Sequence, residues 1–443
     1  MVAQRSITAR LLALAWPIAL SSASGGMMTL VDTVLVGHLG GGALGGVGLA
    51  GMTAMGLLGF ASGLLLGGKV LVAHAEGRSD GASIVSLRAA ATVVALVLGA
   101  LVALCGEAVA LVIPHAAASP AVGAEAQRYL ALRMLGAPAF LLFVALRHVV
   151  EGRGDSRSPM IASVAANAVN AALAWYLVRG AGLGVGGSAL ACAVAQFAEL
   201  AVLWRLAPSR GGAGRADPGI VWRLLRMGLP MAIQSSLEMG AYLAQMFVLA
   251  SLDKAEMSAQ VIACEIVHIA MIPSMAVAEA ACVLVGQAHG GRRAEDAVRL
   301  ARAAAAAALV YAAACAGPLA LAGGSIAAVF SREGAVLAAA ARALPVAALL
   351  LVLDTASAVG RAVLRGRGDV GYAARVGVLC SWVFTPPLTW LFGVRCGLGA
   401  TGAWMAFCAE VTLGAILVWR RFFGLHAPSA CAGGAAHSLG EST

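Results

Sequence analysis

LAWPIALSS, which begins at Leu14, and MGLPMAIQSS, which begins at Met227, repeat one apolar pattern around a proline, Pro17 in the first stretch and Pro230 in the second. VLVAHAEGR at Val70 and VLVGQAHGGR at Val283 repeat with the same offset as the two prolines, and EGRGDS at Glu151 and RGRGDV at Arg365 repeat with nearly that offset. Three matches in one order indicate that the chain contains two copies of one unit. Many membrane transporters are two fused copies of a helical unit, with the site between them near the bilayer centre.

The composition is that of a polytopic membrane protein. Of the 443 residues, 61% are hydrophobic and 12% are charged, whereas soluble domains are about 25% charged. The formal net charge of +9 would suggest nucleic acid in a soluble protein. Here we assign the basic residues to orienting helices in the membrane and expect no nucleic-acid partner. The nine cysteines lie scattered, without the spacing of a metal site.

Twelve apolar stretches are long enough to cross a bilayer, which takes about 20 residues. They cover residues 11–36, 47–72, 88–113, 128–150, 159–179, 184–206, 224–250, 258–287, 298–329, 337–364, 372–394 and 398–419. We therefore predict an all-α membrane protein with twelve transmembrane helices. The predicted divisions are an N-lobe (1–206), a cytoplasmic linker (207–219), a C-lobe (220–425) and a disordered tail (426–443).

The distribution of basic residues predicts the orientation. With the N-terminus inside, 23 of the 30 Lys and Arg residues fall in inside loops and tails, and we count Lys69, Arg147 and Arg361 among them. This bias predicts that both termini are cytoplasmic, in a bacterial inner membrane. Two copies of six spans insert with the same orientation, so a pseudo-two-fold axis along the membrane normal should relate the lobes.

Acidic residues inside the predicted spans are the main functional signal: Asp32, Glu238, Glu265 and Asp354. An ionised carboxylate in mid-bilayer is costly unless it is paired, hydrated or protonated. A helix end near the outer interface is the alternative reading of Asp32. The first copy has Gly25 and Leu141 where the second has Glu238 and Asp354. The scaffold is therefore duplicated but the acids are not, which suggests that the C-lobe is specialised for cations.

A polar stripe surrounds one of these acids. Tyr242 and Gln245 follow Glu238 at four and seven residues, so the three share a helix face that predicts a wet cavity. Taken alone, Tyr242 would more often be a packing residue with its hydroxyl satisfied. His268 follows Glu265 on one side of its helix, and a structural role for it is the alternative to proton carriage.

Three further acids have no polar companions at helical spacing. We interpret them as structural or interfacial: Glu199, Glu279 and Glu410.

Carboxylates in a low-dielectric cavity can exchange protons near neutral pH or bind Na⁺. Either ion would compete with an organic cation for the same negative charge, which is the minimum chemistry of an antiporter and needs no cofactor. The sequence has no phosphate-binding loop, zinc motif or nucleophile elbow. A membrane-embedded enzyme would need a clustered His, Asp or Ser constellation, which we do not find. We therefore expect no enzymatic activity and no structural metal.

At this point the chain resembles the MATE (multidrug and toxic compound extrusion) transporters from about Leu11 to Arg421. WPIALSSASGGMMTLVDTVLVGHLG looks like their first helix, and EGRGDSRSPMIASVAANAVNAAL looks like their fourth-to-fifth helix region. VLVGQAHGG and VLRGRGD look like the ends of the eighth and tenth helices. The resemblance implies a twelve-helix antiporter with two six-helix lobes around a central cavity.

The resemblance also implies roles for the acids. Glu238 matches the seventh-helix acid and Asp354 the tenth-helix acid of NorM-type and eukaryotic members, and Glu265 matches an eighth-helix glutamate of eukaryotic members. Tyr242 matches a tyrosine beside the seventh-helix acid. Asp32 matches the first-helix aspartate.

The chain departs from the archaeal and DinF-like pattern in the fifth helix. There an aspartate lies four residues after an asparagine, whereas Asn170 is followed at that spacing by Ala174. This argues against an N-lobe proton switch of that type. Asn167 and Asn170 could still hydrogen-bond Asp32, and polar packing between helices is the alternative.

We therefore expect a monomeric antiporter, surrounded by membrane lipids, that exports organic cations in exchange for H⁺ or Na⁺. The runner-up is a lipid-linked saccharide flippase of the same superfamily. It would need a basic cavity for phosphate, and Arg133 and Arg147, both near predicted helix ends, are the candidates for it.

Overall fold

The computed structural model describes residues 6–117, 119–207 and 214–425, and these residues form helices without any strand. Residues 208–213 of the predicted linker and the predicted tail 426–443 lie outside the described residues. The first copy contains α1 (Ile7–Gly37), α2 (Gly41–Gly77), α3 (Gly81–Ala116), α4 (Pro120–Met134), α5 (Ala137–Gly152), α6 (Arg157–Trp175), η1 (Tyr176–Gly180) and α7 (Gly184–Leu206). The second contains α8 (Pro218–Leu249), α9 (Lys254–Gly290), α10 (Ala294–Ala327), α11 (Gly334–Arg367), α12 (Val370–Leu388), η2 (Thr389–Arg395) and α13 (Gly399–Gly424).

The fourth predicted span, 128–150, is wrong as a single straight helix. The structure divides it into α4 and α5, which are bent by 49° relative to each other. Pro138 at the start of α5 has no backbone N–H to continue the hydrogen-bond ladder of α4. The neighbouring Gly136 lies against Gln196 and Ala193 of α7, where a β-carbon would collide with the glutamine. The break between α4 and α5 therefore has two causes, the local effect of Pro138 and the packing of Gly136 against α7.

Ten helices of the described residues are long and apolar enough to cross a membrane, and the bent pair α4–α5 is an eleventh candidate. The twelfth crossing element is α8, which is 32 residues long. Its Gln234, Glu238 and Gln245 lower its hydropathy. The helix that carries the predicted stripe is therefore less apolar than its length alone would suggest.

The duplication is visible in the backbone conformation. Ser79 and Arg292 are the two non-glycine residues with positive φ among the described residues, and they hold equivalent positions after α2 and α9. Gly154 and Gly368 occupy matching left-handed positions after α5 and α11. The π-helical turns η1 and η2 also hold equivalent positions in the two copies, and each is followed by a GLG turn with two positive-φ glycines. Only glycine adopts these conformations at low cost, which explains why the GLG turns persist in both copies.

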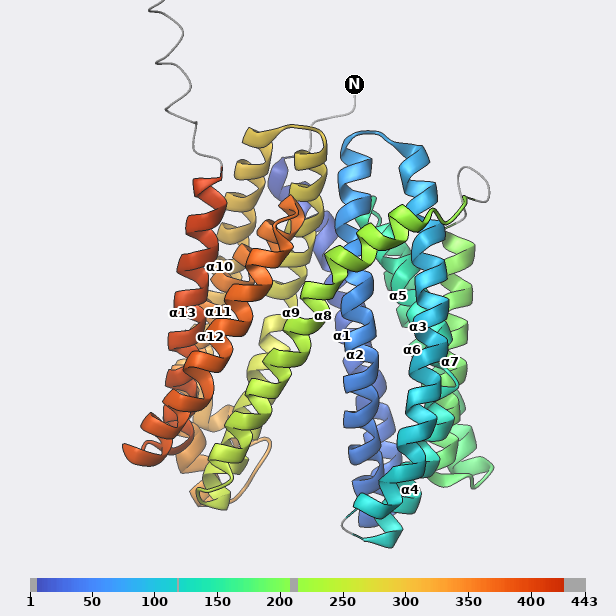
Figure 1. The fold of residues 1–443 in the computed structure, drawn as a ribbon. Coiled ribbons are helices and arrows are strands. Elements are labelled where there is room, and N and C mark those ends of the chain that lie inside the picture. Colours follow the sequence, from blue (N-terminus) through green and yellow to red (C-terminus); the bar gives the residue numbers. More distant parts are fainter. Residues whose placement is uncertain (1–5, 118, 208–213, 426–443) are drawn as a thin grey trace, which may run out of the picture.

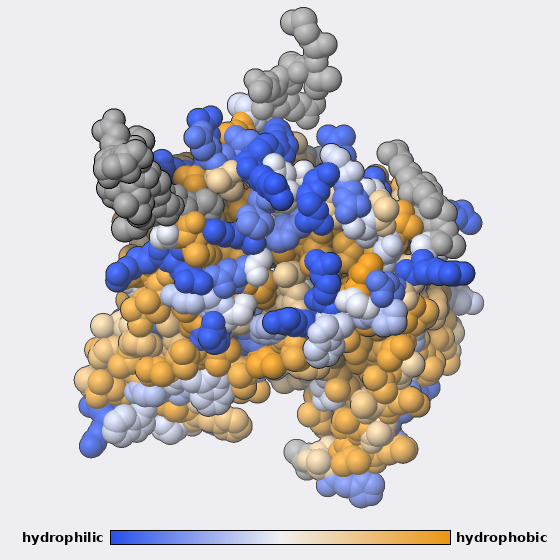
Figure 2. All heavy atoms as spheres, turned by 45° about the horizontal axis from the view of Figure 1, so that its top comes forward, coloured by the Kyte–Doolittle hydropathy of each residue, from blue (hydrophilic) through white to orange (hydrophobic). Residues whose placement is uncertain are grey.

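The helices form two bundles that meet at one end and diverge towards the other (Figure 1). One hydrophobic core is built mainly from α2 to α5, and the others from α9 to α13. The first half of α1 belongs to the second bundle, because Leu11, Leu14 and Ile18 pack in its core. The space-filling view shows the notch between the bundles at the diverging end (Figure 2).

The bundles touch through glycines where they meet. Gly67 of α2 and Gly228 of α8 cross so closely that a β-carbon on Gly228 would lie 1.8 Å from the Leu64 carbonyl oxygen. Gly77 of α2 and Gly290 of α9 approach the opposite backbones in the same way. Small residues let helices associate closely in lipid. These contacts seal one end of the molecule.

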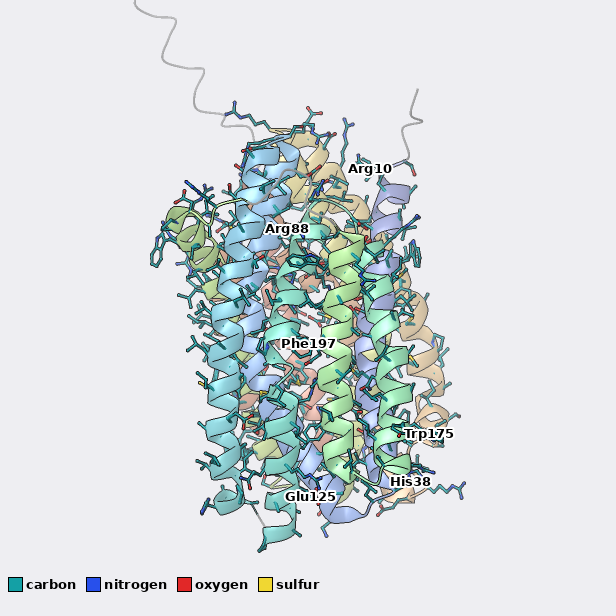
Figure 3. The ribbon with its side chains drawn as sticks, turned by 90° about the vertical axis from the view of Figure 1, so that its right-hand side faces the viewer. Arg10, His38, Arg88, Glu125, Trp175 and Phe197 are labelled. Atoms are coloured by element: carbon teal, nitrogen blue, oxygen red, sulfur yellow. The ribbon has the colours of Figure 1, made fainter. Side chains whose placement is uncertain are left out.

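The surface has an apolar belt. Hydrophilic side chains gather on the face near the chain ends, and apolar side chains cover the flanks below it (Figure 2). On the outside of the first bundle, Arg10 and Arg88 lie towards one end, His38 and Glu125 lie at the other, and Phe197 lies between them (Figure 3). This banding is that of an integral membrane protein.

Candidate functional site

A cavity of about 330 Å³ lies inside the second bundle, between α8, α9, α11, α12 and α13. Its charged lining comes from helices far apart in the sequence: Glu238, Asp354, Arg361 and Glu410. Tyr242, His268, Ser381 and Thr385 add further polar groups, and Met271, Met275, Trp404 and Phe407 add apolar walls. All four charged side chains are half-buried. A polar pocket with apolar walls, embedded between helices, is the usual form of a small-solute site.

Each carboxylate has a neutral or cationic partner. Gln234 Nε2 donates to Glu238 Oε1 at 2.8 Å from one turn earlier on α8. Thr385 of α12 donates to the Glu410 carboxylate of α13. Arg361 Nη2 lies 3.4 Å from Asp354 Oδ1, two turns away on α11. The carboxylates are therefore oriented by hydrogen bonds while they still face the cavity.

Packing of neighbouring helices separates the residues of the predicted polar stripe on α8. Glu238 and Tyr242 line the cavity, but Gln245 is fully buried and donates to Thr389 Oγ1 at 3.0 Å. Gln245 therefore joins α8 to η2 and does not face the cavity. Tyr242 points its hydroxyl towards the Cys264 thiol, 3.9 Å away.

Glu265 and His268, which the sequence placed on one side of α9, also have different surroundings. His268 lines the cavity, whereas Glu265 is exposed and is absent from the cavity lining. Glu265 therefore does not join Glu238 and Asp354 in the cavity lining. The carboxylate that completes the cluster is Glu410, which our sequence reading classed as structural or interfacial.

Glu410 and Arg361 are the site residues that the sequence reading missed. Glu410 has no polar companion at helical spacing on α13, because its hydrogen-bond partner Thr385 and the other cavity acids come from other helices. Arg361 looked like a loop residue, but it lies within α11, well before the last helical residue, Arg367. The one sequence signal for Arg361 was its position two helical turns after Asp354, on the same helix face.

The first bundle encloses Asp32. Its side chain is 4% exposed, and Oδ2 accepts a hydrogen bond of 2.7 Å from the Cys192 thiol. Asn170 lies beside it and is fully buried. Asn167 instead donates to Ser24 and to the Ser163 carbonyl oxygen. For Asn167, these contacts fit the alternative reading, which is polar packing between helices.

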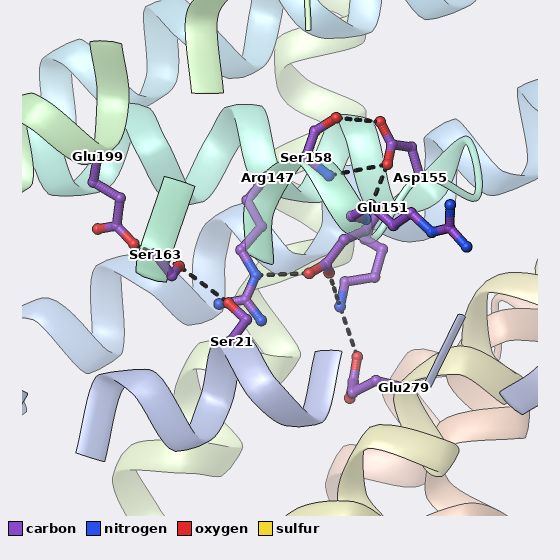
Figure 4. A network of polar contacts seen from close by, with 10 residues as sticks. Ser21, Arg147, Glu151, Asp155, Ser158, Ser163, Glu199 and Glu279 are labelled. Carbon is purple, nitrogen blue, oxygen red and sulfur yellow. Dashed lines mark hydrogen bonds and ion pairs between the residues drawn. The ribbon is translucent and has the colours of Figure 1, made fainter. Parts of the chain in front are cut away.

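A buried ion network joins the two bundles near their sealed end (Figure 4). Lys69 Nζ of α2 lies 2.8 Å from Glu151 Oε2 of α5 and 2.7 Å from Glu279 Oε2 of α9. Arg147 pairs with Glu151 at 2.6 Å, and Arg365 pairs with Glu279 at 2.8 Å. Counting Lys69 and Arg147 as loop residues was wrong, because both lie within helices and the Lys69 side chain is 5% exposed.

The remaining acid of this region, Glu199, accepts a hydrogen bond of 2.7 Å from Ser163. Ser163 also contacts Ser21 of α1 at 3.1 Å, so this chain of contacts ties α7, α6 and α1 together (Figure 4). The described residues contain no group of three His, Cys, Asp or Glu side chains arranged to hold a metal ion.

The chain is similar in sequence to known proteins. The sequence model of the MatE family matches residues 17–176 and 230–391. A probable multidrug resistance protein NorM from Rhodopseudomonas palustris is 30% identical over 431 residues, which cover 92% of this chain and 90% of that protein. A probable NorM from Agrobacterium fabrum is 25% identical over 88% of both chains.

Solved structures show the same fold. A multidrug resistance MATE family transporter in an outward-facing conformation superposes with a TM-score of 0.88 at 20% identity, covering 95% of this chain and 96% of that one. The eukaryotic MATE transporter AtDTX14 gives a TM-score of 0.83 at 18% identity over 95% of this chain and 98% of that one.

Proposed function

Because this chain belongs to the MATE family of transporters, we propose that it is a secondary antiporter that exports organic cations in exchange for H⁺ or Na⁺. The observation that carries the proposal is the acidic cavity of the second bundle, where Glu238, Asp354 and Glu410 face one another. A carboxylate held in a partly desolvated cavity binds either a cation or a proton at one time, because its single negative charge cannot serve both. Competition between ion and solute then couples their movements.

The cavity's charge favours this function over lipid-linked saccharide transport. A flippase would need an unpaired basic cavity for a phosphate group. In the first bundle, Arg147 and Lys69 are both paired with Glu151, and Arg133 faces Asp32 and Gln196. Glu151 pairs with two of these basic side chains, and the negative charge of Asp32 acts on the third, which weakens this region as a site for a phosphate.

The orientation is part of the proposal. Both ends of the described chain lie at the sealed end of the bundle (Figure 1), and the bias of basic residues supports a cytoplasmic position for that end in a bacterial inner membrane. The notch would then face outwards. A fluorescent reporter fused after the last residue should fluoresce in cells, and a fused phosphatase should be inactive; active phosphatase would overturn this orientation.

Dye efflux tests the function. In everted vesicles that contain the protein, an imposed proton gradient or an imposed sodium gradient should drive uptake of ethidium, and the two gradients should be applied separately. The gradient that drives uptake identifies the coupling ion. If neither drives transport of any cationic dye, the antiporter proposal fails.

Variants at the cavity provide the matched control. Glu238→Gln and Asp354→Asn should each abolish gradient-driven uptake, whereas Glu295→Gln should retain it, because Glu295 is exposed and pairs with Arg299 on α10, away from the cavity. Wild-type transport in both cavity variants would remove these carboxylates from the site.

A further inference from the structure

Arg361 is the single basic side chain with a permanent charge among the described residues that line the acidic cavity. Its Nη1 donates to Ser357 Oγ at 2.7 Å, one turn earlier on α11. Its Nη2 lies 3.4 Å from Asp354 Oδ1. Ser357 therefore anchors one nitrogen of the guanidinium against α11, while the other nitrogen reaches the Asp354 carboxylate.

The contact with Asp354 differs from a structural ion pair. The Lys69 pairs with Glu151 and Glu279 are 2.8 and 2.7 Å long, and the Lys69 side chain is 5% exposed. Arg361 and Asp354 are 22% and 19% exposed, and a single long contact joins them. The longer distance and the greater access to solvent make the attraction between Arg361 and Asp354 weaker than the attraction within the Lys69 pairs.

Arg361 also has space to move. It lines a second void of about 10 Å³ behind the cavity, together with Ser357, Cys380 and Glu410. That volume is close to the space of one water molecule. The guanidinium can therefore shift from Asp354 towards Glu410 without leaving α11 or losing a carboxylate partner.

From these observations we propose that Arg361 is a tethered competitor of the transported cation and thereby sets the affinity of the site. In the empty cavity the Arg361 guanidinium pairs with the Asp354 carboxylate, and an entering organic cation must displace the guanidinium towards Glu410. When the solute leaves, Arg361 returns to Asp354, so that this carboxylate is never left without a counter-ion. This inference rests on the proposed cation transport and assigns the residue that limits how tightly the solute is held.

The proposal predicts an increase in affinity when the arginine is removed. With purified protein in detergent, ethidium binding followed by fluorescence should be about tenfold tighter in Arg361→Gln than in the wild type, because the competitor is gone. Arg361→Met, a second neutral variant, should behave in the same way. Arg361→Lys keeps a tethered cation and should stay within about twofold of the wild type.

A double-substitution cycle separates displacement from a general change of charge. In an Asp354→Asn background, Arg361→Gln should change the ethidium affinity by less than about twofold, because the carboxylate for which they compete has been removed. Arg342→Gln is the charge-matched control on α11, since Arg342 is 60% exposed and pairs with Glu256 away from the cavity. It should leave the affinity unchanged.

The outcomes are distinct. Unchanged or weaker ethidium binding in both Arg361→Gln and Arg361→Met overturns the competitor role. The role is also overturned if Arg361→Gln raises the ethidium affinity as much in the Asp354→Asn background as in the wild type. If neither the wild type nor any folded variant binds ethidium, the proposed cation site itself fails, and the inference falls with it.

Discussion

At the scale of the residue, the proposed function depends on three carboxylates that no single helix brings together. Glu238, Asp354 and Glu410 come from α8, α11 and α13 and converge on one cavity. Gln234, Arg361 and Thr385 each contact one of them. Removing a partner or a carboxylate therefore changes both the charge of the cavity and the orientation of the groups that remain.

Glu410 provides the sharpest test at this scale, because the sequence offered no reason to assign it to the site. Glu410→Gln keeps the shape and can still accept the hydrogen bond from Thr385, but it removes one negative charge. We expect the initial rate of gradient-driven ethidium uptake to fall about tenfold. The measurement is uptake in everted vesicles at matched protein amounts. A rate equal to that of the Glu295→Gln control would place Glu410 outside the transport cycle.

At the scale of the element, the duplicated helices are joined by glycine contacts that side chains would disrupt. Gly67 and Gly228 allow α2 and α8 to cross at backbone distance. Close packing of small residues is the main source of helix association in lipid, where burial of apolar surface gains little. This crossing holds the two copies together at the end where they meet.

Gly228→Ala should therefore destabilise the protein. The added β-carbon would overlap the Leu64 carbonyl oxygen, and overpacking of this kind costs about 1–3 kcal/mol. We expect a lower thermal midpoint in detergent than for Gly48→Ala, the control on α2, because nothing lies within 4 Å of a β-carbon there. Equal midpoints for the two variants would show that the crossing tolerates a methyl group.

The sequence predicted the positions of the helices well and the contacts between helices less well. The apolar spans and the two copies follow from local composition and from the repeated turns, which need glycine at fixed positions. The bend at Gly136 depends on contact with α7, and the pairing of Lys69 with Glu279 depends on contact between bundles. Such features arise from tertiary packing, and one sequence does not reveal which distant residues meet.

The same limit explains the division of the predicted stripe. Helical spacing places Glu238, Tyr242 and Gln245 on one face of α8, but η2 and α13 cover the end of that face and bury Gln245. Spacing gives the direction of a side chain on its own helix. Neighbouring helices decide whether that direction leads into a cavity or into packed protein.

At the scale of the whole molecule, Lys69 links the bundles by contacting Glu151 in one and Glu279 in the other. Alternating access requires the bundles to separate at the end where they now meet. Breaking a buried ion pair by removing one partner leaves unpaired charges and costs about 3–5 kcal/mol. The Lys69 network should therefore favour the conformation in which this end is closed.

Lys69→Met should shift the protein away from that conformation. Spin labels on cysteines introduced at Arg157 and Arg293, which are exposed on opposite bundles at this end, report the separation in a background without the native cysteines. We expect an additional population at longer distance in Lys69→Met. The control is Arg299→Met, which removes an exposed pair within α10. Identical distance distributions for the two variants would contradict a role for Lys69 in closure.

The central claim is that solute and coupling ion compete for the same carboxylates. Its most direct test is the ethidium affinity of the purified wild-type protein, measured by fluorescence over a range of pH values and, separately, of sodium concentrations. The account predicts that the apparent Kd rises in proportion to the concentration of one of these ions, while the number of sites stays constant. An affinity that responds to neither H⁺ nor Na⁺ would contradict it.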